Sequence, residues 1–140
     1  MGQKAYEAED IVIRFDPRRC IHAAECVHGL PAVFDADRRP WITPDAASAS
    51  EIVTVVQQCP SGALTYERRD GGPAEVVAPE PSVTTLRNGP LHLRGRCTVT
   101  DHDGTPIDIG PRATLCRCGA SSNKPFCDNS HIEAGFRDDR

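Results

Sequence analysis

Four potential metal ligands lie close together near one end of the sequence. Three cysteines and one histidine occur within the sixteen residues from 116 to 131, namely Cys116, Cys118, Cys127 and His131. The packing of an apolar core gives no reason for this density. Three thiolates and one imidazole suit either a tetrahedral zinc ion or a small iron–sulfur cluster. The residue types therefore predict a metal site and leave zinc and iron–sulfur as alternatives.

The spacing divides these ligands into two pairs. Cys116 and Cys118 would point to opposite sides of an extended chain, so a shared metal requires a turn, and the following loop is rich in turn-forming residues. Cys127 and His131 stand four residues apart, which places them on one face if a helix begins at residues 128–130. Each pair could then hold one iron of a [2Fe-2S] unit.

The whole stretch resembles the signature of the CDGSH, or mitoNEET-like, iron–sulfur proteins. Besides the four ligands, Ser121, Pro125 and Asp128 match, whereas Asn129 stands where the family has Gly. Asn is the commonest non-glycine residue at positive φ, so we expect the turn to survive. The resemblance implies a [2Fe-2S] cluster with Cys116 and Cys118 on one iron and Cys127 and His131 on the other. It also implies an intertwined homodimer with a strand-rich cap.

Two basic residues and a charged tail surround these ligands. Arg117 and Lys124 lie inside the loop, where they either stabilise an anionic cluster or remain solvated. The tail Arg137 to Arg140 is expected to be frayed.

A second set of cysteines lies in the first half of the chain. Cys20, Cys26 and the Cys59-Pro60 pair resemble the divergent monocluster ferredoxin domain, whose pattern is Cys-x-x-Cys-x-x-Cys with a remote Cys-Pro. Ala23 replaces the middle ligand. We therefore expect a [3Fe-4S] cluster, with a [4Fe-4S] cluster as the alternative, its fourth iron held by His22, another side chain or water. Without the resemblance, three buried structural thiols would be the rival interpretation.

The apolar pattern predicts the elements that position both sets. Residues 9–16 alternate like a half-buried strand, with Ile11, Ile13 and Phe15 on one side and Val12 and Arg14 on the other. A helix is expected to start at a Ser48–Glu51 capping box and to bury Ile52, Val55, Val56 and Cys59. Residues 63–66 predict a strand that pairs with the first. Four short strands at 83–86, 91–94, 97–100 and 105–109 predict an antiparallel cap.

The sequence thus predicts an α+β chain of two small domains. Residues 1–68 form a ferredoxin-like cluster domain, and residues 83–140 form a CDGSH domain with a β cap and a cluster-binding loop. Residues 69–82 are rich in Pro and Gly and are read as a semi-rigid linker.

Composition limits the setting in which this chain works. Seven cysteines, an odd number at irregular spacing, argue against a secreted disulfide framework. The first ten residues are polar, and no apolar run approaches a membrane span. With a net charge of −4 and no basic stripe, nucleic acid is a poor partner. We expect a cytoplasmic protein that binds neither membranes nor nucleic acid.

These patterns favour an electron carrier over an enzyme. The main hypothesis is an iron–sulfur electron-transfer protein with two different clusters that serves a redox partner protein. A pH- or redox-labile cluster donor or sensor, which would pass its cluster to an apo-acceptor, is the second hypothesis. A zinc-stabilised interaction module is the third.

Overall fold

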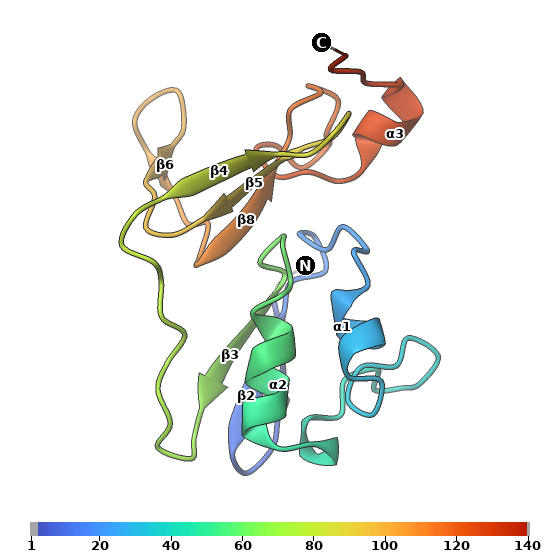
Figure 1. Cartoon of the computed structure of the whole chain (residues 1–140), viewed down its shortest axis with the longest axis vertical. Helices are drawn as coiled ribbons and strands as arrows, with labels where there is room; N and C mark the ends of the chain where they lie inside the picture. Colours follow the sequence, from blue (N-terminus) through green and yellow to red (C-terminus); the bar gives the residue numbers. More distant parts are fainter. Residues whose placement is uncertain (1–2, 140) are drawn as a thin grey trace. The chain divides into compact units, whose positions relative to one another are not determined.

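The structure is a computed structural model that describes residues 3–139, and it forms two compact units (Figure 1). The first unit comprises the chain up to Cys59 together with Ala63–Val76; the second comprises Pro60–Gly62 and the chain from Val77 onward. The chain is mixed α/β and rich in strands, with several small antiparallel sheets and few helices. The border at residues 76 and 77 lies within the predicted linker. Met1, Gly2 and Arg140, which the sequence analysis assigned to the two domains, lie outside the described residues.

The first unit contains a three-stranded antiparallel sheet. Its order is β1 (Lys4–Glu7), β2 (Ile11–Phe15) and β3 (Leu64–Arg68), so that β2 pairs on both sides. The strand predicted at residues 9–16 and its pairing with residues 63–66 are both confirmed. Val12, expected on the less buried side, is only 1% exposed. Strand β1 was not predicted because its sequence, Lys-Ala-Tyr-Glu, carries little apolar signal.

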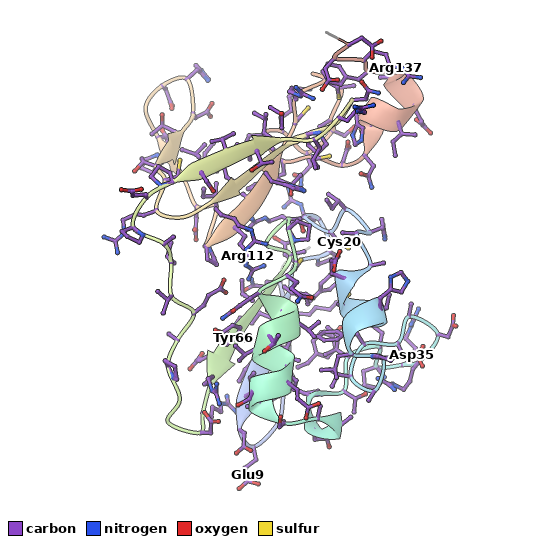
Figure 2. All side chains as sticks on the ribbon, in the orientation of Figure 1. Glu9, Cys20, Asp35, Tyr66, Arg112 and Arg137 are labelled. Carbon is purple, nitrogen blue, oxygen red and sulfur yellow. The ribbon has the colours of Figure 1, made fainter. Side chains whose placement is uncertain are left out.

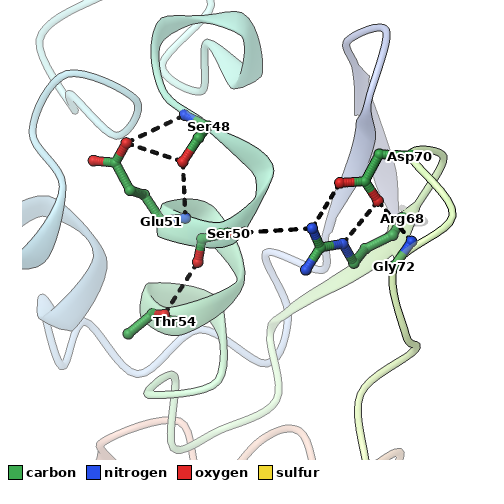
Figure 3. A network of polar contacts seen from close by, with 7 residues as sticks. All are labelled: Ser48, Ser50, Glu51, Thr54, Arg68, Asp70 and Gly72. Carbon is green, nitrogen blue, oxygen red and sulfur yellow. Dashed lines mark hydrogen bonds and ion pairs between the residues drawn. The ribbon is translucent and has the colours of Figure 1, made fainter.

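Helix α2 (Ala49–Val56) packs on this sheet through an apolar face. Its start is fixed as predicted: Glu51 N–H donates to Ser48 Oγ at 3.2 Å, and the Glu51 carboxylate accepts from Ser48 (Figure 3). Figure 3 also shows Arg68, at the end of β3, bridging Asp70 and Ser50. The buried core comprises Ile11, Ile13, Val33, Phe34, Ile42, Ala49, Ile52, Val55, Val56 and Leu64.

The predicted extension of this helix to Cys59 is wrong. Helix α2 ends at Val56, and Cys59 follows its C-terminus while still packing against the core. The cause is Pro60, because a proline disfavours helical backbone in the residue before it.

Short elements complete the first unit. Helix α1 (Glu25–Gly29) is a single turn that ends at Gly29, and a 3₁₀ turn η1 (Pro44–Ala46) precedes α2. An antiparallel bridge joins Phe34 and Ile42 in a short hairpin. Trp41 covers it, with its ring 5.0 Å from that of Phe15 in an edge arrangement.

The second unit is built on two small antiparallel sheets. Strands β4 (Ser82–Thr85), β5 (Leu91–Arg94) and β8 (Arg112–Leu115) pair in that order, while β6 (Val99–Thr100) and β7 (Pro106–Ile107) form a separate pair. Of the four predicted cap strands, the one at 91–94 is confirmed at its bounds as β5, the one at 83–86 is shifted by one residue as β4, and those at 97–100 and 105–109 are shortened to β6 and β7. Strand β8 was missed, although it leads directly into Cys116. Leu93, Ile109 and Ala113 form the buried centre.

One five-residue helix, α3 (Ser130–Ala134), closes the second unit and carries His131. Within residues 3–139, no helix is both long and apolar enough to span a bilayer.

Candidate iron–sulfur centres

The loop that carries the C-terminal ligands is closed by its own backbone. Strand β8 is prolonged by an antiparallel bridge between Leu115 and Phe126. On either side of this bridge, Cys116 N–H donates to the Pro125 carbonyl at 2.7 Å and Cys127 N–H donates to the Thr114 carbonyl at 2.9 Å. The backbone therefore fixes the first and third cysteines at the end of the sheet.

The four ligands come together as two pairs. The Sγ atoms of Cys116 and Cys118 are 3.8 Å apart, and Cys127 Sγ lies 3.7 Å from His131 Nδ1. A tetrahedral metal with bonds to sulfur of about 2.3 Å separates two sulfur ligands by about 3.8 Å, and a sulfur and a nitrogen by slightly less. Each pair is thus spaced as two ligands of one metal would be. Within residues 3–139, no three His, Cys, Asp or Glu side chains are grouped closely enough to hold a single ion.

Backbone amides surround the three sulfur atoms. Gly119, Ala120 and Asn129 donate their N–H groups to the Sγ atoms of Cys116, Cys118 and Cys127, each at 3.3 Å. Such donors stabilise a thiolate more than a thiol, and they are among the levers that set cluster potentials.

Two of these thiols have shifted pKa values. Burial raises the pKa of Cys116, but hydrogen bonds from the amides of Ser121 and Gly119 and from Cys118 outweigh it, so the pKa lies below its ordinary value. Burial raises the pKa of Cys127 above its ordinary value; the Asn129 amide opposes this, and the charges of Cys116, Asp128 and Cys118 add to it.

Two residues with positive φ shape the loop. Gly119 has φ +83°, and Asn129, which precedes α3, has φ +71°. The expectation that Asn can replace Gly at position 129 is therefore confirmed. His131 is oriented with Nδ1 toward Cys127, while its Nε2 lies 3.6 Å from the position that a Cβ on Gly89 would take.

Ser121 and Asp128 stabilise the loop through hydrogen bonds within it. Ser121 Oγ donates to the Phe126 carbonyl at 2.6 Å. The Asp128 carboxylate accepts the N–H groups of Ser130 at 3.0 Å and Ser122 at 2.9 Å. Hydrogen bonds from Ser130 and Ser122 lower the pKa of Asp128. Through these contacts both residues hold the loop rather than the metal.

Arg117, between the first two ligands, forms hydrogen bonds with the turn between β4 and β5. Its guanidinium donates to the carbonyls of Leu86 and Gly89, both at 2.7 Å, and pairs with Asp138. It also lies 5.1 Å from the centre of the Phe136 ring, within cation–π range. Of the two roles predicted for Arg117, the solvated one is wrong, because its side chain is only 18% exposed.

The expected fraying of the C-terminal tail is also wrong as far as residue 138. Asp138 accepts from Arg117 and donates its N–H to Asn88 Oδ1 at 3.0 Å. We call Arg117, Asn88 and Asp138 the C-terminal clasp. It joins the ligand loop, the β4–β5 turn and the tail. Arg140 lies outside the described residues. Sequence reasoning missed the clasp because nothing in the order of residues links position 117 to position 138.

Three of the four N-terminal candidates line one recess, and Cys59 is not part of its lining. Cys20 (labelled in Figure 2), His22 and Cys26 line a mainly apolar cavity of about 650 Å³ together with Lys4, Arg39 and Trp41. His22 and Ala24 both have positive φ, at +58° and +65°, which is uncommon outside Gly and Asn and marks a sharply bent segment.

The three N-terminal thiols are close enough to interact electrostatically. Burial raises the pKa of Cys20, opposed by the His22 amide and reinforced by the charge of Cys59. Burial likewise raises the pKa of Cys26 to about 11, and the charges of Cys59 and Cys20 contribute. No cysteine in residues 3–139 forms a disulfide.

Comparison with known proteins assigns both halves of the chain to families. Residues 6–69 match the family model described as a divergent 4Fe-4S mono-cluster, and residues 88–132 match the model described as an iron-binding zinc finger of CDGSH type. The chain belongs to the divergent mono-cluster iron–sulfur family and joins to that domain a second one of the CDGSH type.

Two curated bacterial proteins are similar to part of the chain. Uncharacterized protein YjdI of Escherichia coli strain K12 is 38% identical over 68 residues, which are 49% of this chain and 90% of the relative. The protein of the same name in Escherichia coli O157:H7 matches to the same extent. The similarity therefore covers nearly the whole relative and about half of this chain.

Proposed function

We propose that the protein is an electron carrier with two different iron–sulfur clusters in one chain. A [2Fe-2S] cluster would be held by Cys116, Cys118, Cys127 and His131. A [3Fe-4S] cluster would be held by Cys20, Cys26 and Cys59. The observation that carries the proposal is the arrangement of the C-terminal ligands as two pairs, each at the spacing of two ligands on one tetrahedral metal.

The same geometry favours a two-iron cluster over zinc at the C-terminal site. A single zinc ion requires all four ligands around one point, whereas two pairs match two metals joined by bridging sulfides. When bound, such a cluster supplies one-electron chemistry. The chain supplies four ligands and three hydrogen bonds from backbone amides to the sulfur atoms. The neutral imidazole of His131 in place of a thiolate would raise the potential relative to an all-cysteine site.

Three iron atoms suit the N-terminal site best because the chain offers three thiols there. Ala23 supplies no ligand at the middle position of the run. The alternative is a [4Fe-4S] cluster, which the family description names. It would need a fourth ligand, and we propose His22, since it lines the recess with Cys20 and Cys26.

A second function is favoured by the mixed ligand set at the C-terminal site. A single histidine is the ligand from which protons displace iron most readily, so the site suits release of a cluster to an apo-acceptor, or sensing of pH or redox state. This reading differs from the first in outcome, because a donor loses its cluster and a carrier keeps it.

Further parts of the proposal concern the setting. We propose a reducing, cytoplasmic compartment, supported by seven cysteines of which none forms a disulfide in residues 3–139. We propose a CDGSH-type homodimer, supported by strand β4, an edge strand with all four residues exposed. We also propose a ferredoxin-like first domain, and a carrier rather than an enzyme.

Electron paramagnetic resonance on anaerobically purified protein, with iron and zinc counted on the same sample, tests the main proposal. We expect a [3Fe-4S] signal in the protein as isolated and a [2Fe-2S] signal after reduction with dithionite. A reduced [4Fe-4S] signal would show that a further ligand replaces the one missing at Ala23. Zinc without any paramagnetic signal would refute both cluster assignments. Transfer of the cluster to an apo-acceptor at neutral pH would favour the donor function.

A further inference from the structure

A shallow recess beside His131 carries two arginines and an exposed apolar side chain. The recess has a volume of about 320 Å³, and its lining includes Arg87, Asn88, His131, Ile132, Phe136 and Arg137. It is formed by the β4–β5 turn on one side and by α3 with the following tail on the other. The His131 side chain is therefore part of its wall.

The two arginines have no partner of their own. Arg87 and Arg137 are exposed, and neither forms an ion pair or hydrogen bond with another residue in the range 3–139 (Arg137 is labelled in Figure 2). No carboxylate lines the recess. Asp138 beside it is already engaged by Arg117, and the exposed Glu133 and Asp139 lie outside its lining. The lining of the recess itself therefore carries two positive charges and no carboxylate, on a chain whose net charge is −4, while Asp138 and Asp139 line an adjoining hollow with the same two arginines.

An apolar side chain lines the recess together with these charges. Ile132 is 70% exposed, and it directly follows the ligand His131. An apolar residue flanked by arginines has the composition of a protein interface, where Arg is enriched and pairs with carboxylates in a bidentate way.

The C-terminal clasp holds the two sides of the recess in place. Asn88, next to Arg87, accepts the N–H of Asp138, next to Arg137, at 3.0 Å. The two arginines come from segments fifty residues apart in sequence, so their common position depends on this contact. Two backbone segments that are already held together lose less conformational entropy on binding than two independent ones.

We propose that this recess is the docking surface for an acidic protein partner, which exchanges electrons with the C-terminal cluster through the His131 side. The inference rests on the proposed electron-transfer function and adds to it the face used and the charge of the partner. Carboxylates around the partner's redox centre would pair with Arg87 and Arg137, and an apolar residue would cover Ile132.

The test compares electron transfer to two soluble redox proteins of opposite charge, an acidic flavodoxin and a basic cytochrome c. Stopped-flow absorbance of the probe protein gives second-order rate constants with the reduced full-length chain at low and high ionic strength. We expect the rate with flavodoxin to fall as salt is added and the rate with cytochrome c not to fall.

Charge reversal locates the surface. The double variant Arg87→Glu, Arg137→Glu should slow reaction with flavodoxin by about tenfold at low ionic strength, and the difference should shrink in high salt. The variant Ile132→Ser should slow the reaction with flavodoxin at both salt concentrations. The matched control is Arg96→Glu, an exposed arginine of the same unit outside the recess, which should change the rate by less than about twofold. Electron paramagnetic resonance of each variant confirms that the cluster is retained.

Two results would overturn the proposal. Arg96→Glu changes the net charge by half as much as the double variant, so slowing by Arg96→Glu that is as large per unit of charge would show that only net charge matters. An unchanged flavodoxin rate in the double variant, with normal reduction by methyl viologen, would refute the docking surface and leave the carrier function standing. A cluster that cannot be reduced even by methyl viologen would refute the carrier function and this surface with it.

Discussion

Replacing Arg117 by Lys should loosen the C-terminal cluster without removing any ligand or any charge. Arg117 donates to the Leu86 and Gly89 carbonyls at 2.7 Å and pairs with Asp138, and its side chain is only 18% exposed. A lysine ammonium is a compact group that cannot span the same fork of acceptors. At least one of the two carbonyl bonds is therefore lost in the variant.

The size of the effect follows from that loss. A hydrogen bond from a charged donor contributes about 1.5–3 kcal/mol, so the loop in the variant should open more easily by about 2 kcal/mol. This corresponds to roughly a thirtyfold larger open population. If the cluster escapes through this opening, its loss should accelerate by a similar factor.

The assay is iron release to an excess of chelator, with the [2Fe-2S] signal followed by electron paramagnetic resonance and the N-terminal cluster as an internal reference. Arg137→Lys is the matched control, since Arg137 is exposed and forms no ion pair in residues 3–139. Asp138→Asn keeps both carbonyl bonds of Arg117 and should have a smaller effect. If Arg117→Lys releases iron no more than about threefold faster than the wild type, the clasp does not control the site and the reasoning fails.

Three further predictions concern acid, base and the loop backbone. Acidification should bleach the C-terminal cluster before the N-terminal one, because protons compete with iron for the imidazole of His131. The variant His131→Cys should slow this loss. Visible spectra recorded during an acid titration test the prediction, and earlier loss of the N-terminal cluster would contradict it. Burial raises the pKa of Cys26 to about 11 from an ordinary value of 9.0. The folded apo-protein then keeps a proton that the unfolded chain releases, so its stability should be complete below pH 9 and fall between about pH 9 and 11. Urea unfolding of Cys26→Ala should show a weaker decline in that window, and an identical decline would point to other groups. Gly119→Ala should cost about 1 kcal/mol from its left-handed φ alone, since no atom lies within 4 Å of the added Cβ. Gly95→Ala should cost more, because its Cβ would lie 2.3 Å from the Glu80 carbonyl oxygen; equal denaturation midpoints would refute the distinction.

The sequence was sufficient for elements whose cause is local. The capping box at Ser48 and Glu51 identified the start of α2, and alternation identified β2. The turn at Asn129 followed from the residue type alone. Each of these depends on neighbours within a few positions, which is the range over which a sequence pattern carries information.

The missed features depend on contacts between distant segments. Strand β1 forms by pairing with the edge of β2, and β8 forms by pairing with the edge of β5. Neither β1 nor β8 has a clear apolar alternation in its own sequence. The end of α2 at Val56 rather than Cys59 is an exception, because its cause, Pro60, is the neighbour of Cys59 in the sequence. The link from Arg117 to Asp138 spans twenty-one residues and has no pattern that predicts it.

The closure of the ligand loop has a consequence for how such sites can spread among proteins. All four C-terminal ligands lie between Cys116 and His131, and the backbone bonds around the Leu115–Phe126 bridge close the loop on itself. Outside this segment, the loop requires only a strand that it can extend and an acceptor for Arg117. The N-terminal set, by contrast, draws Cys59 from beyond a helix that depends on a complete core. The C-terminal site should therefore be transferable between proteins. Its segment, grafted onto the end of an antiparallel strand in an unrelated scaffold, should assemble its ligands there. The N-terminal site can be transferred only as a whole domain.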